Sequence, residues 1–96
     1  MPERNLQNRL LVATALWREV SADPLPRLAP GEPAAQIEEL ELRVVELLCA
    51  EATRESAREV ADKTWDLVYD RADDDPVKRR VVECHEALSK LTTLES

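Results

Sequence analysis

The 96-residue chain has one glycine and no phenylalanine, and aromatic residues make up only 3% of it. Sheet proteins need turn residues such as glycine together with aromatic and β-branched strand formers. The valines and threonines here are scattered among alanine, leucine, glutamate and arginine, which favour helices. These shortages predict an all-α fold, and a chain of this length holds one modest core, so we expect a single domain.

Cysteine and histidine are also scarce. Cys49 and Cys84 are too few for a disulfide scaffold, and with His85 they do not supply the four ligands of a structural zinc site. Cys49 and Cys84 both fall on apolar faces of expected helices, where they suit core packing. Phosphate-loop, nucleophile-elbow and zinc-protease motifs are absent from the sequence. We therefore expect no enzymatic activity, no cofactor and no metal, and the small number of cysteines favours a cytoplasmic location.

Positive charge is in the minority, with 13 Lys and Arg against 20 Asp and Glu, for a net charge of −7. Binding to a nucleic-acid backbone needs a concentrated Lys/Arg surface, and anionic membranes attract polybasic segments. No stretch approaches the ~18 apolar residues of a membrane span. The charge balance therefore predicts no nucleic-acid or membrane partner, and it favours a protein partner with a basic surface.

Proline punctuates the chain at two places. Four of the 13 residues from Ser21 to Pro33 are prolines, which should end a first helix and form a stiff connection. Asp75 and Pro76 supply an N-cap and a first helical residue for a last helix. Apolar residues at spacings of three and four predict helices over about residues 3–20, 34–52, 57–72 and 76–92. The short apolar run Leu10–Trp17 is interpreted as part of the first helix, not as a secretory leader, because Arg18 and Glu19 follow it.

The stretch from Ala34 to Asp75 contains neither glycine nor proline, so it can form one helix or two. Unbroken, it would be about 60 Å long and would need a second copy to cover it. A capping-box pattern from Ser56 to Glu59 favours a break near residues 52–56. We therefore expect a small bundle of four antiparallel helices with one long connection and two short ones. The alternative is three helices, with a long central helix that dimerises.

The apolar residues between Leu42 and Ala52 cover an arc of about 220°, wider than the ~100° of an ordinary surface helix. This second helix should therefore lie at the centre of the bundle, or it should carry a homodimer seam in addition to the core.

The third helix carries the candidate interaction surface. One side of its helical wheel is apolar, and carboxylates lie almost opposite. Like charges four residues apart cost about 0.2–0.5 kcal/mol per pair in isolated helices, so stability alone does not favour this pattern. Two aromatic residues lie beside the acidic stripe, as interface anchors often do. The expected partner-binding residues are Glu55, Glu59, Asp62, Trp65, Asp66, Tyr69, Asp70 and Asp73. The alternative is a solvated acidic face with the two aromatics in the core.

Three cations, Lys78-Arg79-Arg80, fall in the first turn of the last helix, where the helix dipole disfavours positive charge. Two interpretations are open. The acidic run Asp73–Asp75 compensates them locally, or they meet carboxylates of a second copy or of a partner.

The run Asp66-Leu67-Val68-Tyr69, followed by Asp74-Asp75-Pro76, is similar to the segment around the third and fourth helices of nuclease-colicin immunity proteins. Those proteins are small acidic four-helix inhibitors. The resemblance covers a short part of the chain, and the family's Tyr-Tyr-Pro is Tyr69-Asp70-Arg71 here, so it assigns no membership.

Taken together, these patterns predict a small acidic, non-enzymatic protein-interaction module that acts as an adaptor, regulator or inhibitor. The alternatives are a structural homo-oligomer and a small accessory subunit of a larger enzyme complex.

Overall fold

The computed structural model describes residues 5–28 and 30–93, and within these ranges the chain forms four α-helices and no strand. The helices are α1 (Leu6–Val20), α2 (Pro33–Glu51), α3 (Ala57–Val68) and α4 (Pro76–Thr93). The expected all-α, four-helix bundle is confirmed. Residues 3 and 4, where the first helix was expected to begin, lie outside the described part of the chain.

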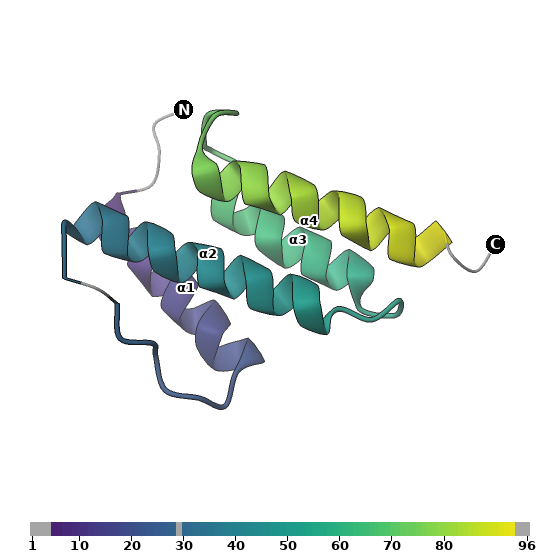
Figure 1. Cartoon of the computed structure of the whole chain (residues 1–96), viewed down its shortest axis with the longest axis horizontal. Coiled ribbons are helices and arrows are strands. Elements are labelled where there is room, and N and C mark those ends of the chain that lie inside the picture. The colour runs from purple at the N-terminus through teal and green to yellow at the C-terminus, as the bar shows by residue number, and fades with distance from the viewer. Residues whose placement is uncertain (1–4, 29, 94–96) are drawn as a thin grey trace.

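The helices pack into a flattened body whose backbone extends 46 × 33 × 18 Å (Figure 1). Short turns make α3 antiparallel to both α2 and α4, as expected. The long connection carries the chain back along the bundle, so α1 and α2 run in the same direction (Figure 1). Within the described ranges, α2 and α3 contact each other at the centre, while α1 and α4 flank them and do not touch one another.

The predicted break between the second and third helices is present, because α2 ends at Glu51 and α3 begins at Ala57. The predicted capping box is not formed. Ser56 has φ −95° and ψ −5°, a helical conformation, whereas an N-cap residue that reaches forward is usually extended. Its Oγ instead accepts a hydrogen bond from the Thr53 N–H at 2.8 Å, and Thr53 Oγ1 accepts from the Ser56 N–H at 3.1 Å.

The predicted start of α4 is confirmed in detail. The N–H groups of Val77 and Lys78 donate to Asp75 Oδ1 at 2.9 and 3.1 Å, and Pro76 is the first helical residue. By contrast, α3 ends at Val68, four residues before the expected end at residue 72. After Val68 the backbone turns, and the Arg71 side chain enters the protein interior.

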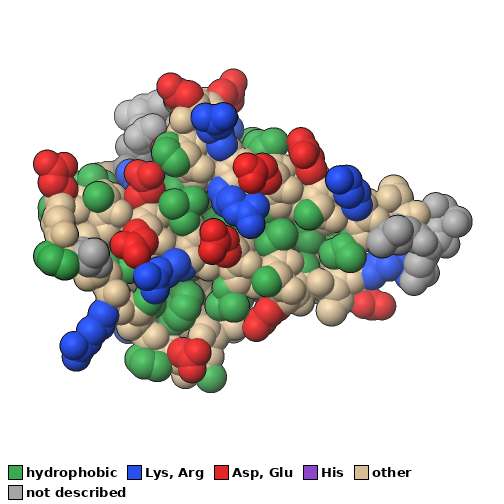
Figure 2. Space-filling model, viewed as in Figure 1, with side chains coloured by type: hydrophobic (Ala, Val, Ile, Leu, Met, Phe, Trp, Pro, Cys, Tyr) green, Lys and Arg blue, Asp and Glu red, His purple; other side chains and the backbone are tan. Residues whose placement is uncertain are grey.

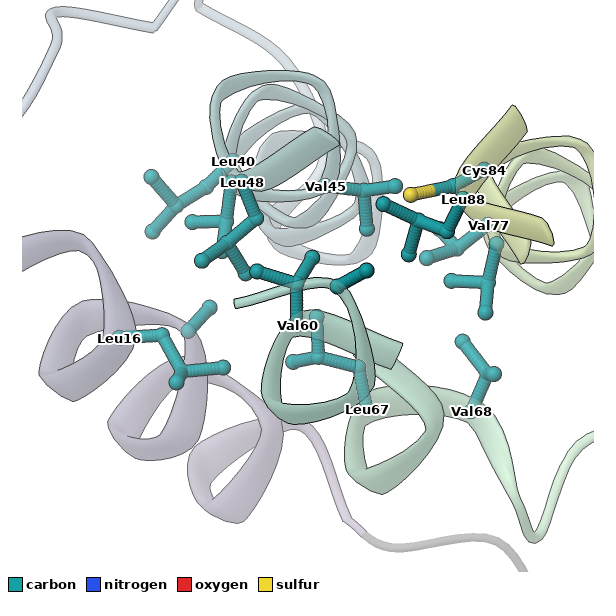
Figure 3. Close-up of a cluster of buried hydrophobic side chains, with 14 residues drawn as sticks. Leu16, Leu40, Val45, Leu48, Val60, Leu67, Val68, Val77, Cys84 and Leu88 are labelled. Carbon is teal, nitrogen blue, oxygen red and sulfur yellow. The ribbon is translucent and has the colours of Figure 1, made fainter. Parts of the chain in front are cut away.

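The core is built from aliphatic side chains and one cysteine, and it contains no aromatic ring among the described residues (Figure 3). Its buried members are Ala13, Leu16, Leu40, Val44, Val45, Leu48, Ala57, Val60, Leu67, Val68, Val77, Val81, Cys84 and Leu88. Because α2 packs against α1, α3 and α4, its wide apolar arc is used within the chain. The structure thus places α2 at the centre of the bundle, the first of the two expected roles.

A buried ion-pair network connects three segments of the bundle. Glu41 of α2 has no exposed surface, and its carboxylate accepts from Arg9 Nη2 at 2.7 Å and from Arg71 Nη2. Arg71 Nη1 also lies 3.5 Å from Asp75 Oδ1. Burying a charge is costly unless it is paired and hydrogen-bonded, so this network sets the relative positions of α1, α2 and the α3–α4 turn.

In the stretch 5–28 and 30–93, no helix combines the length and the apolar character needed to cross a membrane.

Candidate protein-interaction surface

Two of the three aromatic residues of the chain lie on the surface. Trp65 on α3 is 41% exposed, and Tyr69 just beyond the end of α3 is 50% exposed. The third, Trp17, packs partly buried against the core, and its Nε1–H donates to the Asp23 carbonyl at 3.1 Å. Aromatic side chains can bury the most apolar area of all residue types, yet none of them is in the core and two of the three are exposed to solvent.

Trp65 is held in place by α4. Its ring lies 6.0 Å from the His85 ring at an interplanar angle of 45°, and Lys78 Nζ lies 5.5 Å from its centroid. Lys78 Nζ is itself fixed by Asp73 Oδ1 at 3.1 Å and by the Arg71 carbonyl at 2.8 Å. The indole is therefore oriented before any partner arrives, which lowers the entropic cost of using it as an anchor.

His85 connects α4 to α3 beneath Trp65. Its Nε2 lies 3.0 Å from the Ala61 carbonyl and 3.1 Å from Thr64 Oγ1. A carbonyl can only accept, so Nε2 carries the hydrogen in this arrangement. The Thr64 hydroxyl lies 3.0 Å from the Val60 carbonyl, to which it can donate while its oxygen accepts from His85. From the sequence, His85 was considered only as a zinc ligand. Its hydrogen-bond partners on α3 could not be predicted, because they depend on how α3 and α4 pack.

The eight expected partner-binding residues do not all lie on one helix. Glu59, Asp62, Trp65 and Asp66 are on α3, Glu55 is in the turn before it, and Tyr69, Asp70 and Asp73 follow its end. The wheel assumed a helix to residue 72, so its acidic stripe is correct over α3 and wrong beyond Val68. Because Lys78 Nζ contacts both Asp73 and the Trp65 ring, Asp73 still lies near Trp65.

Part of the acidic charge is balanced within the protein. Lys63 Nζ lies 3.2 Å from a carboxylate oxygen of Glu59 and 3.2 Å from one of Glu19 on α1. Hydrogen bonds to Glu59 and then to Glu19 hold the pKa of the Lys63 amino group above its ordinary value. Asp62 and Asp66, which flank Trp65 along α3, are both exposed.

The basic cluster in α4 is largely compensated at short range. Lys78 pairs with Asp73, while Arg80 lies 3.9 Å from Glu46 of α2 and 3.5 Å from Glu83. Figure 2 shows basic side chains interspersed among the acidic ones over the face formed by α2 and α4. Lys78 is thus compensated by the acidic run before α4, as one interpretation proposed, whereas Arg80 lies near carboxylates of α2 and α4 that neither interpretation named.

The α3–α4 seam is hollowed next to His85. A shallow pocket of about 210 Å³ is lined by Ala57, Arg58, Ala61, His85, Leu88, Ser89 and Thr92. Its lining combines small apolar side chains with hydroxyl groups, a guanidinium and an imidazole. Since His85 also lies against Trp65, this pocket adjoins the exposed indole along the seam.

Neither a metal-binding cluster nor a similar protein adds information about this surface. In the residues that the structure describes, no three His, Cys, Asp or Glu side chains gather as a metal-binding group. Comparison with known protein families, with curated proteins and with solved structures found no match.

Proposed function

We propose that this protein is a non-enzymatic interaction module, acting as an adaptor, regulator or inhibitor, that binds a partner protein with a basic surface. The contact surface consists of Trp65 and Tyr69 with the carboxylates around them. The observation that carries the proposal is the exposure of two aromatic side chains in a protein whose core contains none.

Trp65 and Tyr69 expose apolar area to water in the free protein. Leaving such area in water costs about 25 cal/mol per Å², so a half-exposed indole is unfavourable in the free protein. Trp and Tyr are enriched among the few residues that dominate binding energies at interfaces. The support that His85 and Lys78 give Trp65 is what a fixed anchor requires.

The charge argument concerns recognition. Asp62 and Asp66 lie three residues before and one residue after Trp65. Exposed carboxylates around an aromatic anchor steer a basic partner to it and raise the association rate. They contribute less to final affinity than the buried anchor, since exposed ion pairs are worth about 0–1 kcal/mol.

The test is capture of partners from the native host by the immobilised protein, with proteins identified by mass spectrometry. The double variant Trp65→Ala/Asp66→Lys should lose a partner that the wild type retains, while its circular dichroism spectrum stays helical. If this variant retains every protein that the wild type captures, the proposal is wrong.

A matched control lies on the long connection. Leu25 is 40% exposed, close to the 41% of Trp65, and Asp23 is an exposed carboxylate nearby. Leu25→Ala/Asp23→Lys therefore makes the same kinds of change away from α3. It should capture the partner as the wild type does, and the capture should weaken as salt is raised.

A second candidate, self-association, rests on α1. Leu10 and Leu11 are 41% and 62% exposed, whereas most apolar residues of the α2 arc pack in or against the core of the same chain. A homo-oligomer would therefore form through α1. Sedimentation at micromolar concentration distinguishes the two candidates, because a strict monomer excludes this one.

A further inference from the structure

The two cysteines of the chain face each other across the α2–α4 contact. These helices run in the same direction (Figure 1), and Arg80 Nε of α4 lies 3.9 Å from Glu46 Oε1 of α2. Residues three or four positions apart share a helix face. Cys49 follows Glu46 by three residues and Cys84 follows Arg80 by four, so the next turn along both helices brings the thiols together.

The side-chain contacts agree with this register. Cys84 is completely buried, and Figure 3 shows its sulfur directed from α4 toward α2. Cys49 is half-buried and packs against the same core. An interaction with Cys49 contributes, after burial, to the raised pKa of the Cys84 thiol, and neither cysteine is in a disulfide. Cys49 is therefore the more accessible residue of the pair, and Cys84 is the enclosed one.

We propose that Cys49 and Cys84 form a thiol–disulfide exchange site, at which a small-molecule disulfide such as oxidised glutathione converts the pair into a disulfide joining α2 to α4. The site does not depend on partner binding.

The reaction proceeds in two balanced steps. The Cys49 thiolate attacks one sulfur of the small disulfide, forms a mixed disulfide and releases one thiolate, which takes up a proton. Cys84 then gives its proton to water and attacks the Cys49 sulfur, which expels the second small thiolate. Two protein thiols are oxidised, and one small disulfide is reduced to two small thiols.

The burial of Cys84 sets the order of the steps. Desolvation, followed by the interaction with Cys49, raises the pKa of the Cys84 thiol to about 12. Because the thiolate is the nucleophile, Cys84 reacts poorly with a reagent in solution and closes the ring slowly at neutral pH. At pH values below about 12, each increase of one pH unit should accelerate ring closure about tenfold, because the thiolate fraction of Cys84 rises by that factor.

The experiment uses the reduced full-length chain, oxidised glutathione at pH 8, acid quenching, and alkylation of the remaining thiols in denaturant before intact-mass analysis. The wild type should lose both alkylatable thiols and end without a glutathione adduct. Cys84→Ala should stop as a single glutathione adduct on Cys49. Cys49→Ser should remain unmodified over the same period.

Three results would overturn the proposal. These are a wild type that keeps a stable glutathione adduct with Cys84 still alkylatable, a wild type that forms disulfide-linked dimers, and a wild type that does not react. The midpoint of thermal unfolding provides an independent measurement. A disulfide that fits the native packing should raise this midpoint relative to the reduced protein, and a lower midpoint also counts against the site.

Discussion

Glu41 and Arg71 form an ion pair that water does not reach, with side chains 0% and 2% exposed. The two residues come from different parts of the chain, the middle of α2 and the turn after α3. Arg9 of α1 also pairs with the Glu41 carboxylate, so three segments of the chain meet at one buried charge. The free-energy cost of removing this charge should therefore far exceed that of removing a surface charge.

Replacing Glu41 with leucine should lower the free energy of unfolding by about 3–5 kcal/mol, because Arg71 would stay buried without its main counter-charge. Urea unfolding followed by circular dichroism measures this change. Glu39, on the same helix, pairs with Arg43 at 2.9 Å but is 39% exposed, so Glu39→Leu should cost less than about 1 kcal/mol. Equal effects at the two positions would show that burial of the pair does not matter.

Removing both charges tests the origin of that cost. Adding Arg71→Met to Glu41→Leu should recover a large part of the lost stability, since apolar replacement of a buried pair is often neutral or stabilising. If the double variant is as unstable as the sum of the single ones, the two side chains do not act as a pair.

Replacing Asp75 with alanine should cost about 1–2 kcal/mol, because the N–H groups of Val77 and Lys78 would lose their acceptor. Asp75→Asn keeps an equivalent cap and should recover most of this loss. Asp74→Ala, at the exposed neighbouring position, should change the free energy of unfolding by less than about 0.5 kcal/mol. An equal loss for the alanine and asparagine variants would instead assign the effect to the contact with Arg71.

Alkaline pH should destabilise the reduced protein through Cys84. Burial keeps this thiol neutral in the folded state and raises its pKa from 9.0 to about 12. Its stabilising contribution is therefore complete below pH 9.0 and is lost as the pH rises toward about 12. The expected slope in that window is about 1 kcal/mol per pH unit. Urea unfolding between pH 8 and 10.5 should show a shallower decline for Cys84→Ala than for the wild type, and parallel declines would contradict this account.

Charge reversal at Asp66 should slow association with a basic partner and should reduce the salt dependence of the association rate. Surface plasmon resonance with the captured partner measures both quantities. Asp74→Lys, outside the set of partner-binding residues, provides the comparison and should change both less. If Asp66→Lys leaves the salt dependence unaltered, the carboxylates beside Trp65 do not steer the partner.

The helices could be predicted because their boundaries depend on local chemistry. The prolines of the connection and the Asp75-Pro76 pair affect only the backbone within a few residues of them. The structure has helix ends at both places. The end of α3 could not be predicted in this way. It ends early where Arg71 turns inward to a carboxylate 30 residues earlier in the chain. A contact at that distance leaves no periodic trace in the sequence.

A signal for the buried charge was nevertheless present. Glu41 lies four residues from both Ile37 and Val45, on the apolar side of its helix, where a carboxylate requires a buried partner. For the candidate surface, the wheel placed Trp65 and Tyr69 together. It could not supply the support from α4, because that depends on how two helices pack.

The long connection between α1 and α2 has a consequence for folding order. The turns between α2, α3 and α4 are short, so these helices form contacts after closing small loops, whereas α1 must wait for a larger one. Once docked, α1 contributes only Ala13 and Leu16 to the buried core, and the Arg9–Glu41 and Glu19–Lys63 pairs hold it at two points. Its amides should therefore exchange with solvent deuterium before those of α2, which makes α1 the last helix to assemble and the first to detach.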